Sequence, residues 1–284
     1  VEVAPYKRDP ADFVLWKPAG SEEPGWESPW GRGRPGWHIE CSAMARRYLG
    51  VAFDIHAGGQ DLIFPHHENE IAQSTCCGDP FAQVWLHNGH VLVDGAKMAK
   101  SAGNFITVRD LLDRGHAGET VRLALLSTHY RQPLDLSSRK LAEAKAKLDR
   151  LYRALEAAPE IAPAPPADDV VAALAEDLNT PAAFGELHEL ARLTFLLDGT
   201  ARARAAGQLR AGAQLLGLLR QDPASWFRGA ADATDAAEIE RLVAARSAAR
   251  ARRDFAAADR IRDTLADRGI AVADTPEGPR WQRV

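Results

Sequence analysis

The chain has 284 residues, of which 46% are hydrophobic, and its formal net charge is −4. This length is enough for two or three domains, and the net charge by itself does not indicate nucleic-acid binding. No apolar run approaches the roughly 18 residues of a membrane span, nothing resembles a signal peptide, and three cysteines are too few for a disulfide framework. We therefore expect a globular protein of a reducing, cytoplasmic compartment that makes no contact with a membrane.

The first third of the chain predicts an α/β arrangement. Residues 1–50 are rich in Gly, Pro and Trp and predict loops around short elements. The apolar runs 52–55 and 91–93 are compatible with buried parallel strands. Between them, residues 66–75 can form a helix, with Pro65 at its start, where proline is tolerated.

After residue 105 the pattern becomes helical. Short amphipathic helices are predicted at 107–114 and 119–126, and a long helix from an N-cap at Ser137 or Ser138 to about residue 157. The apolar positions of the long helix repeat at helical spacing and predict its buried face: Leu141, Leu148, Leu151, Tyr152 and Leu155. Pro159 should follow its end, and the Ala/Pro run 162–167 indicates a linker.

The last third predicts two helical groups and a hairpin. Alanine-rich helices at about 168–177, 181–198 and 202–220 suggest a small bundle, and the stretch 217–234 contains a second break. A helix pair at about 235–251 and 254–268 leads into strands at 270–273 and 280–283, joined by a turn at 275–278.

Two dense segments contain potential metal ligands. They are Pro-Gly-Trp-His-Ile-Glu-Cys at 35–41 and Phe-Pro-His-His-Glu-Asn-Glu at 64–70. A thiolate from Cys41, an imidazole from His66 and a carboxylate from Glu70 can supply three ligands of a tetrahedral zinc ion. On a helix, His66 and Glu70 lie four residues apart and share one face. The alternative is that these residues only pack, since a lone buried cysteine is usually a packing residue.

Further on, Lys97-Met98-Ala99-Lys100-Ser101 places two lysines around a short turn. Mobile ammonium groups can neutralise the charge that builds on the leaving phosphates of ATP. The alternative is a pair of solvated surface lysines. A zinc site followed by a lysine-rich phosphate loop suggests an enzyme that recognises a soft ligand and handles a nucleotide.

These segments resemble the bacterial cysteinyl-tRNA synthetase family. The resemblance begins at residues 7–17, Lys-Arg-Asp-Pro-Ala-Asp-Phe-Val-Leu-Trp-Lys, and continues through both zinc segments, the lysine loop and Gly103-Asn104-Phe105. It resumes at residues 248–263 and 274–278 and is weak over roughly 160–245. It implies a partial Rossmann-type α/β catalytic domain, then mainly α-helical domains and a small mixed α/β C-terminal domain.

The resemblance also implies a division of the chain and an activity. The expected parts are half of the catalytic domain at 1–105, a helical stem-contact region at 106–160, a helical bundle at 161–230 and an anticodon-binding domain at 231–284. The implied activity is the ATP-dependent activation of cysteine and its transfer to tRNA-Cys, with one zinc ion as cofactor and ATP used as substrate with magnesium.

Individual site residues follow from the resemblance as well. It assigns zinc ligation to Cys41, His66 and Glu70, with a fourth cysteine ligand outside this chain, and gives His67 and Glu68 supporting positions. Trp37 and His56 match positions lining the cysteine pocket, whereas Cys76 and Cys77 match no ligand position. Lys97 and Lys100 match the signature loop, in which Ala99 replaces a serine, with Lys100 as the ATP-contacting lysine. Asp61, after Gly58-Gly59, could contact the adenylate.

The C-terminal segment carries the implied RNA-reading residues. From Arg241 onward there are ten arginines and six acidic residues, a local excess of positive charge. By resemblance, anticodon reading involves Arg250, Phe255, Asp259, Arg262 and Asp274. Arginine can pair with base edges or phosphates, and an aromatic ring can stack on an unstacked base. The alternative is a salt-bridged helical surface.

The sequence departs from the family pattern in one major respect. Such enzymes carry an upstream His-x-Gly-His signature in an N-terminal half of the catalytic domain, and we do not find it. The match His87-Asn88-Gly89-His90 is rejected because an apolar, strand-like run follows it, not a helix start. We therefore expect a C-terminal portion of a longer enzyme that is inactive alone. The alternatives are a naturally truncated, non-catalytic tRNA-binding protein, or a related cysteine ligase of thiol biosynthesis, which should lack an anticodon module.

Overall fold

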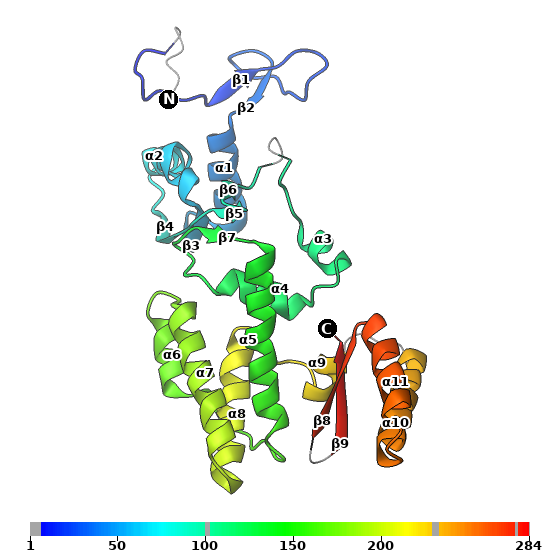
Figure 1. Cartoon of the computed structure of the whole chain (residues 1–284). Helices are drawn as coiled ribbons and strands as arrows, with labels where there is room; N and C mark the ends of the chain where they lie inside the picture. Colours follow the sequence, from blue (N-terminus) through cyan, green and yellow to red (C-terminus); the bar gives the residue numbers. More distant parts are fainter. Residues whose placement is uncertain (1–6, 100–102, 229–232, 276–277, 284) are drawn as a thin grey trace. The chain divides into compact units, whose positions relative to one another are not determined.

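The computed structural model describes residues 7–99, 103–228, 233–275 and 278–283 (Figure 1). Its strands are β1 (Trp16–Pro18), β2 (Gly33–Pro35), β3 (Ala52–Gly59), β4 (Phe81–Asn88), β5 (Val91–Val93), β6 (Ala96–Lys97), β7 (Leu134–Asp135), β8 (Ile270–Thr275) and β9 (Gly278–Arg283). Its helices are α1 (Trp37–Leu49), α2 (Glu68–Cys76), α3 (Val108–Asp113), α4 (Gly118–Leu126), α5 (Ser138–Glu156), α6 (Asp168–Ala175), α7 (Thr180–Leu196), α8 (Gly199–Leu215), α9 (Pro223–Arg228), α10 (Ala233–Ala251) and α11 (Phe255–Asp267).

The described residues divide into two compact units. Unit 1 comprises those up to Asn104 together with Tyr130–Asp135, and unit 2 comprises Phe105–His129 and everything from Leu136 onward. The finer four-part division expected from the sequence stays a prediction. No helix within the described ranges is both long enough and apolar enough to span a bilayer.

Unit 1 contains a β–α–β arrangement. Strand β3 pairs in parallel with β4, and α2 lies between them in the chain. Parallel pairing was expected for residues 52–55, but the strand runs on to Gly59 and only Phe53 in it is buried. Its partner β4 was not predicted. Strand β5 pairs with β6 antiparallel and with β7 in parallel, so the run 91–93 is a strand as expected.

The expectation that residues 1–50 are mainly loop was wrong for α1. Gly36 precedes this helix in extended conformation, and Gly50 ends it with a positive φ of 95°. Glu40 in the first turn and Arg46 and Arg47 in the last complement the helix dipole. Most of the Gly, Pro and Trp residues that suggested a loop lie before the helix, and their number outweighed the strong helix formers within it.

The sequence His87-Asn88-Gly89-His90 lies between β4 and β5. The backbone N–H of Gly89 donates to Tyr130 O at 2.7 Å, and a Cβ at Gly89 would collide with the Gln132–Pro133 backbone. This glycine therefore serves close packing of two chain segments, and no helix start follows it. The expectation that a strand follows this sequence is confirmed by β5.

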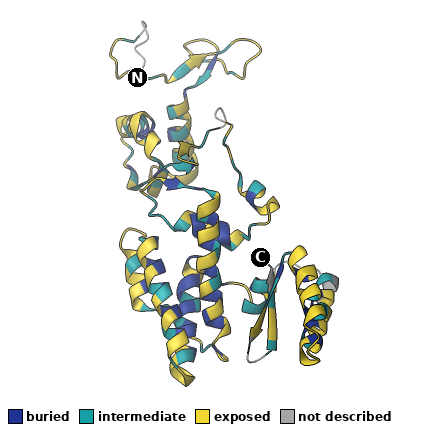
Figure 2. Ribbon diagram, in the orientation of Figure 1, coloured by how far each residue is buried: buried dark blue, intermediate teal, exposed yellow. Residues whose placement is uncertain are grey.

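Unit 2 is organised around α5. Ser137 caps it, its side chain accepting from Lys140 N, and the predicted apolar stripe from Leu141 to Leu155 is buried (Figure 2). Helices α6, α7 and α8 form the expected bundle, with Leu187 and Leu209 fully buried. Residues 162–167 form neither helix nor strand, and they pack on α8 through the Ala162 N–H, which donates to Ala203 O at 3.1 Å.

The last segment forms a small module, which we call the C-terminal module: α10, α11 and the antiparallel hairpin β8–β9. Its core is Ile239, Val243, Leu265 and Ile270, with Trp281 partly buried against them. The predicted helix pair followed by a hairpin is confirmed; residues 276 and 277, in the predicted turn, lie outside the described residues.

Candidate functional site

Three residues predicted to bind zinc converge in unit 1. Cys41 lies on α1, His66 just before α2, and Glu70 within α2. Their ligand atoms all lie within 4.8 Å of one another, and His66 Nε2 is 2.6 Å from Glu70 Oε1. The four-residue spacing of His66 and Glu70 therefore brings both side chains to one point, and α1 brings the thiol.

Glu70 is a buried carboxylate without a cationic partner among the described residues. It is 1% exposed, and burial raises its pKa to about 7. His56 Nε2 lies 2.8 Å from Glu70 Oε2. The two atoms are not aligned as a hydrogen bond, and neither has another hydrogen-bonding partner. A buried carboxylate in this condition is costly, and a bound cation would relieve the cost.

Neutral imidazoles surround this carboxylate. His38 Nδ1 lies 2.7 Å from His66 Nδ1, and His67 Nδ1 lies 2.8 Å from His87 Nε2. Burial lowers the pKa of His38, His56 and His66, and lowers that of His67 to about 4. An unprotonated ring has a nitrogen available as a ligand, and a neighbour that fixes its other nitrogen fixes its orientation.

The donor set fits zinc. Burial, and then the charge of Glu70, raise the pKa of the Cys41 thiol, so a cation is needed to make it a good ligand. Sulfur, imidazole nitrogen and carboxylate oxygen are the ligands zinc prefers. His56, His67 and Glu70 form a second group of close ligand atoms that shares the same carboxylate, which the sequence did not predict.

The two residues assigned to the cysteine pocket lie against this cluster. The Trp37 ring stacks on His66 with centroids 4.1 Å apart, and His56 reaches Glu70. Trp37 also lines a cavity of about 880 Å³, together with Phe13, Trp16 and Phe64. An aromatic ring and a polar side chain therefore lie beside the ligand atoms, and their role in a cysteine pocket stays a prediction.

The lysine loop is partly described. Lys97 Nζ lies 3.2 Å from Asp61 Oδ2, so the two residues singled out as nucleotide contacts pair with each other. Asn104, to which no role was given, brackets the loop: its Oδ1 accepts from Ala99 N and its Nδ2 donates to Lys97 O. Lys100 and Ser101 lie outside the described residues.

The five residues assigned to anticodon reading lie in the C-terminal module. Arg250 on α10 pairs with Asp274 on β8, and Arg262 pairs with Asp259 at 2.9 Å on α11. Phe255 opens α11 and is 61% exposed. The module therefore presents an aromatic side chain and paired charges on one pair of helices and one strand.

Sequence analysis missed three polar residues of these clusters. His38 and His87 contact His66 and His67, and Arg246 contacts Asp274. A signal existed for Arg246: it follows Ile239 and Val243 at helical spacing, so it occupies a position where an apolar residue is expected. For the histidines, the only signal was their place within segments already singled out.

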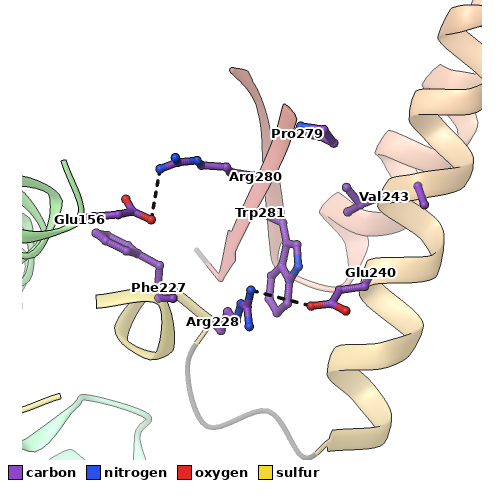
Figure 3. Close-up of a pocket in the computed structure, with 10 residues that line it drawn as sticks. Glu156, Phe227, Arg228, Glu240, Val243, Pro279, Arg280 and Trp281 are labelled. Atoms are coloured by element: carbon purple, nitrogen blue, oxygen red, sulfur yellow. Dashed lines mark ion pairs between the residues drawn. The ribbon is translucent and has the colours of Figure 1, made fainter. Parts of the chain in front are cut away.

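A cavity of about 410 Å³ lies where β9 meets α9, α10 and the end of α5 (Figure 3). Two ion pairs border it, Arg280–Glu156 at 3.2 Å and Arg228–Glu240 at 3.9 Å, and the Trp281 ring points into the space between them. None of the residues singled out from the sequence lines this cavity. The cavity lies between elements of unit 2, and it includes neither the candidate zinc ligands nor the residues assigned to anticodon reading.

Comparisons with known proteins cover most of the chain. The family model for the class I (C) tRNA synthetase catalytic domain matches residues 1–146. The DALR domain model matches residues 169–220, and the model for the cysteinyl-tRNA ligase anticodon binding domain matches residues 235–281.

Two curated relatives match this chain over its whole length. A cysteine–tRNA ligase of Paramagnetospirillum magneticum is 58% identical and one of Rhodospirillum rubrum 56% identical, each over 100% of this chain and 63% of its own length. The chain thus spans about three fifths of the length of these relatives. Among solved structures, a leucyl-tRNA synthetase complex from Agrobacterium radiobacter K84 aligns at 18% identity and a TM-score of 0.48, over 68% of this chain and 32% of that one.

Proposed function

Because the chain belongs to the class I tRNA synthetase family, in its cysteinyl branch, we propose that it provides the amino-acid-reading and tRNA-reading parts of a cysteine–tRNA ligase. The observation that carries this proposal is that one chain combines a catalytic-domain match with an anticodon-binding match. The second match argues against the related cysteine ligase of thiol biosynthesis, for which no anticodon module is expected. In this role the protein would act in the cytoplasm.

In the proposed ligase, Cys41, His66 and Glu70 would hold a zinc ion, with a fourth ligand from outside this chain. When bound, the ion supplies a soft acid that favours deprotonated sulfur and so distinguishes cysteine from serine. Shape alone would discriminate by only about 1–3 kcal/mol for a group of that size. The carboxylate of Glu70, uncompensated by any described cation, supports a cation at this point.

The surrounding side chains would orient the substrate. Trp37 offers an apolar wall to the substrate side chain, and its stacking on His66 keeps that imidazole in place. His56 offers a polar contact on the side of Glu70. If His66 uses Nε2 as a ligand, its Nδ1–H donates to His38 Nδ1, and this hydrogen bond fixes the ring.

The lysine loop would act on ATP. Attack of the cysteine carboxylate on the α-phosphorus releases pyrophosphate, on which negative charge builds. Lys97 and Lys100 would neutralise that charge. ATP would arrive with magnesium. In the structure Lys97 pairs with Asp61, an exposed contact worth about 0–1 kcal/mol, so the lysine can exchange this partner for phosphate at little cost.

The C-terminal module would bind the anticodon of tRNA-Cys. Arg250, Asp259, Arg262 and Asp274 offer donors and acceptors, and Phe255 offers a ring on which a base can stack. This surface would let the ligase select its tRNA independently of the amino acid.

The test is cysteine-dependent ATP–pyrophosphate exchange in a completed ligase, meaning this chain joined to the part of the Paramagnetospirillum magneticum relative that it does not cover. Exchange with cysteine, and far less with serine at the same concentration, is the expected result. Lys100→Ala should lower the exchange rate by about 100-fold, whereas Lys147→Ala, an exposed lysine of α5, should not. Equal exchange with serine would contradict the proposal.

A further inference from the structure

Arg246 is a charged residue in an apolar position. It lies on α10 at helical spacing from Ile239 and Val243, two core residues of the C-terminal module, and is itself 8% exposed. Burying a guanidinium costs free energy unless the group is paired and hydrogen-bonded. An apolar residue at this position would stabilise the module without that cost, so the presence of arginine calls for a reason.

Its partner is the carboxylate of Asp274 on β8. Nη1 of Arg246 donates to Oδ1 at 2.8 Å, and Nη2 donates to Oδ2 at 3.1 Å. This is a bidentate pair, and its two parallel hydrogen bonds fix the plane of the carboxylate as well as its position. Because Arg246 lies beneath the surface, the pair fixes Asp274 from the core side.

The other side of Asp274 faces solvent. The side chain of Asp274 is 48% exposed, compared with 9% for that of Arg246. Arg250, one turn further along α10 and 45% exposed, binds Oδ2 of the same carboxylate. Among the described residues Oδ1 accepts only from Arg246, so a lone pair on the solvent side remains available to a donor from outside.

Asp274 is ionised at neutral pH, and hydrogen bonds from Arg246, together with its charge, lower its pKa further. An ionised carboxylate only accepts hydrogen bonds, so it can select the amino or imino N–H of a nucleobase and reject a carbonyl. Such selection requires a fixed orientation, because a freely rotating carboxylate would accept from many directions.

The surroundings suit a splayed-out base. Phe255 is exposed at the start of α11, and Asp259 follows one turn later. Helix α11 packs against α10 and β8, the two elements that carry Arg246 and Asp274. The helix that carries the stacking ring thus packs against the elements that carry the acceptor and the exposed guanidinium of Arg250.

We propose that Arg246 is a positioning residue for anticodon recognition: its buried guanidinium holds the Asp274 carboxylate so that the solvent-facing oxygen accepts from one base edge. This inference rests on the proposed function of the C-terminal module. Arg246 does not touch the RNA; it acts through Asp274. Lysine cannot replace it, because an ammonium group is a point charge and does not fix the carboxylate plane.

The experiment measures binding of labelled RNA hairpins to the 284-residue chain by fluorescence anisotropy. One hairpin carries the anticodon that decodes cysteine codons, and three others each carry one altered anticodon base. The variants are Arg246→Lys, Arg246→Met, Asp274→Asn and the double variant Arg246→Lys with Asp274→Asn. The matched control is Arg268→Lys, because Arg268 also binds two carboxylate oxygens, one of Asp235 and one of Glu238, but at the other end of the same helix pair.

The wild-type chain should prefer the cysteine hairpin. Arg246→Lys and Arg246→Met should each lose about 5- to 20-fold of that preference, at the same anticodon position at which Asp274→Asn loses it. The double variant should lose no more than Asp274→Asn alone, and the control should match the wild type. Circular dichroism would verify that each variant is folded; Arg246→Met supplies an apolar side chain suited to the site if Arg246→Lys is unstable.

Two results would overturn the inference while leaving anticodon reading intact: a folded Arg246→Lys chain with unchanged preference, or one that weakens all four hairpins equally. The second would mean that Arg246 is only a structural link between α10 and β8. A wild-type chain without any preference would instead contradict anticodon recognition by this module, and the role of Arg246 with it.

Discussion

Glu70 in unit 1 and Asp274 in unit 2 are two carboxylates in opposite situations. Glu70 is 1% exposed, lies among neutral histidines, and has its pKa raised to about 7 by burial. Asp274 is half-exposed, lies between two arginines, and has its pKa lowered by them. The first lacks a countercharge and is suited to receive a cation; the second has its countercharge built in and is suited to offer a fixed acceptor to a neutral group.

The difference matches the two recognition tasks that we propose for this chain. A cation site needs negative charge that the protein leaves uncompensated, which destabilises the empty site. A base-reading site needs charge that stays in place when the ligand is absent, which stabilises the free protein. Four substitutions test this contrast, two at each region.

The largest effect is expected for Cys41→Ala in the completed ligase. Loss of the thiolate should remove most bound zinc and lower cysteine-dependent exchange by more than about 100-fold, since even supporting residues of metal sites are worth 10- to 100-fold. Metal analysis and exchange kinetics would measure both. Cys76→Ala, at an exposed cysteine, is the control. Unchanged zinc content in Cys41→Ala would refute the ligand assignment.

Arg262→Ala should separate the two regions functionally. Cysteine-dependent exchange should stay near normal, whereas charging of tRNA-Cys should fall by the equivalent of about 1–3 kcal/mol if one base contact is lost. Charging kinetics on wild-type and anticodon-altered tRNA would show whether the loss depends on sequence. A loss shared equally by all tRNAs, with a weaker salt dependence, would indicate a phosphate contact instead.

Glu70→Gln should stabilise the metal-free protein while weakening zinc binding. Because the folded-state pKa of Glu70 is raised, the folded protein holds an unfavourable charge at pH 8 that it does not hold at pH 4.5. The folding stability of the wild type should therefore fall relative to that of the variant as pH rises from about 4.5 to about 7. Thermal unfolding of both metal-stripped proteins at pH 5 and pH 8 would test this. A variant less stable than the wild type at pH 8 would contradict an uncompensated charge.

Asp274→Asn should have the smallest of the four effects, a slight loss of folding stability, whereas Glu70→Gln should increase stability. The lowered pKa of Asp274 contributes stability above its unfolded value of 3.8, and this contribution is lost as pH falls through the folded-state pKa. Since the side chain is half-exposed, the destabilisation at pH 7 should be about 1 kcal/mol or less. Hydrogen exchange of peptides from α11 and β8 would measure it. No difference between variant and wild type at pH 7 would mean that the arginines do not stabilise the carboxylate.

Much of unit 2 was predictable because its signals are local. The stripe from Leu141 to Leu155 and the N-cap at Ser137 lie within one helix, and both are confirmed. The helix pair and hairpin of the C-terminal module are confirmed for the same reason. Unit 1 was harder to predict, because α1 follows a Gly- and Pro-rich stretch and Gln83 divides the apolar residues of β4 into two short runs.

The candidate sites divide in the same way. Their residues could be listed from motifs, but their partners could not. That His38 meets His66 depends on α1 packing against α2, and that Arg246 meets Asp274 depends on α10 packing against the hairpin. Whether these assigned residues act as expected stays a prediction.

Local patterns in the sequence were enough to predict the shared face of His66 and Glu70 and the helices of unit 2 apart from α9, because helical periodicity and four-residue spacing operate over one or two turns. Helix α9 (Pro223–Arg228) lies within a stretch where a break was predicted. Whether a carboxylate has a cationic partner depends on the tertiary structure. It surrounded Glu70 with uncharged rings and placed Arg246 under Asp274, since burial and pairing depend on segments that are distant in the chain and meet only when the protein folds.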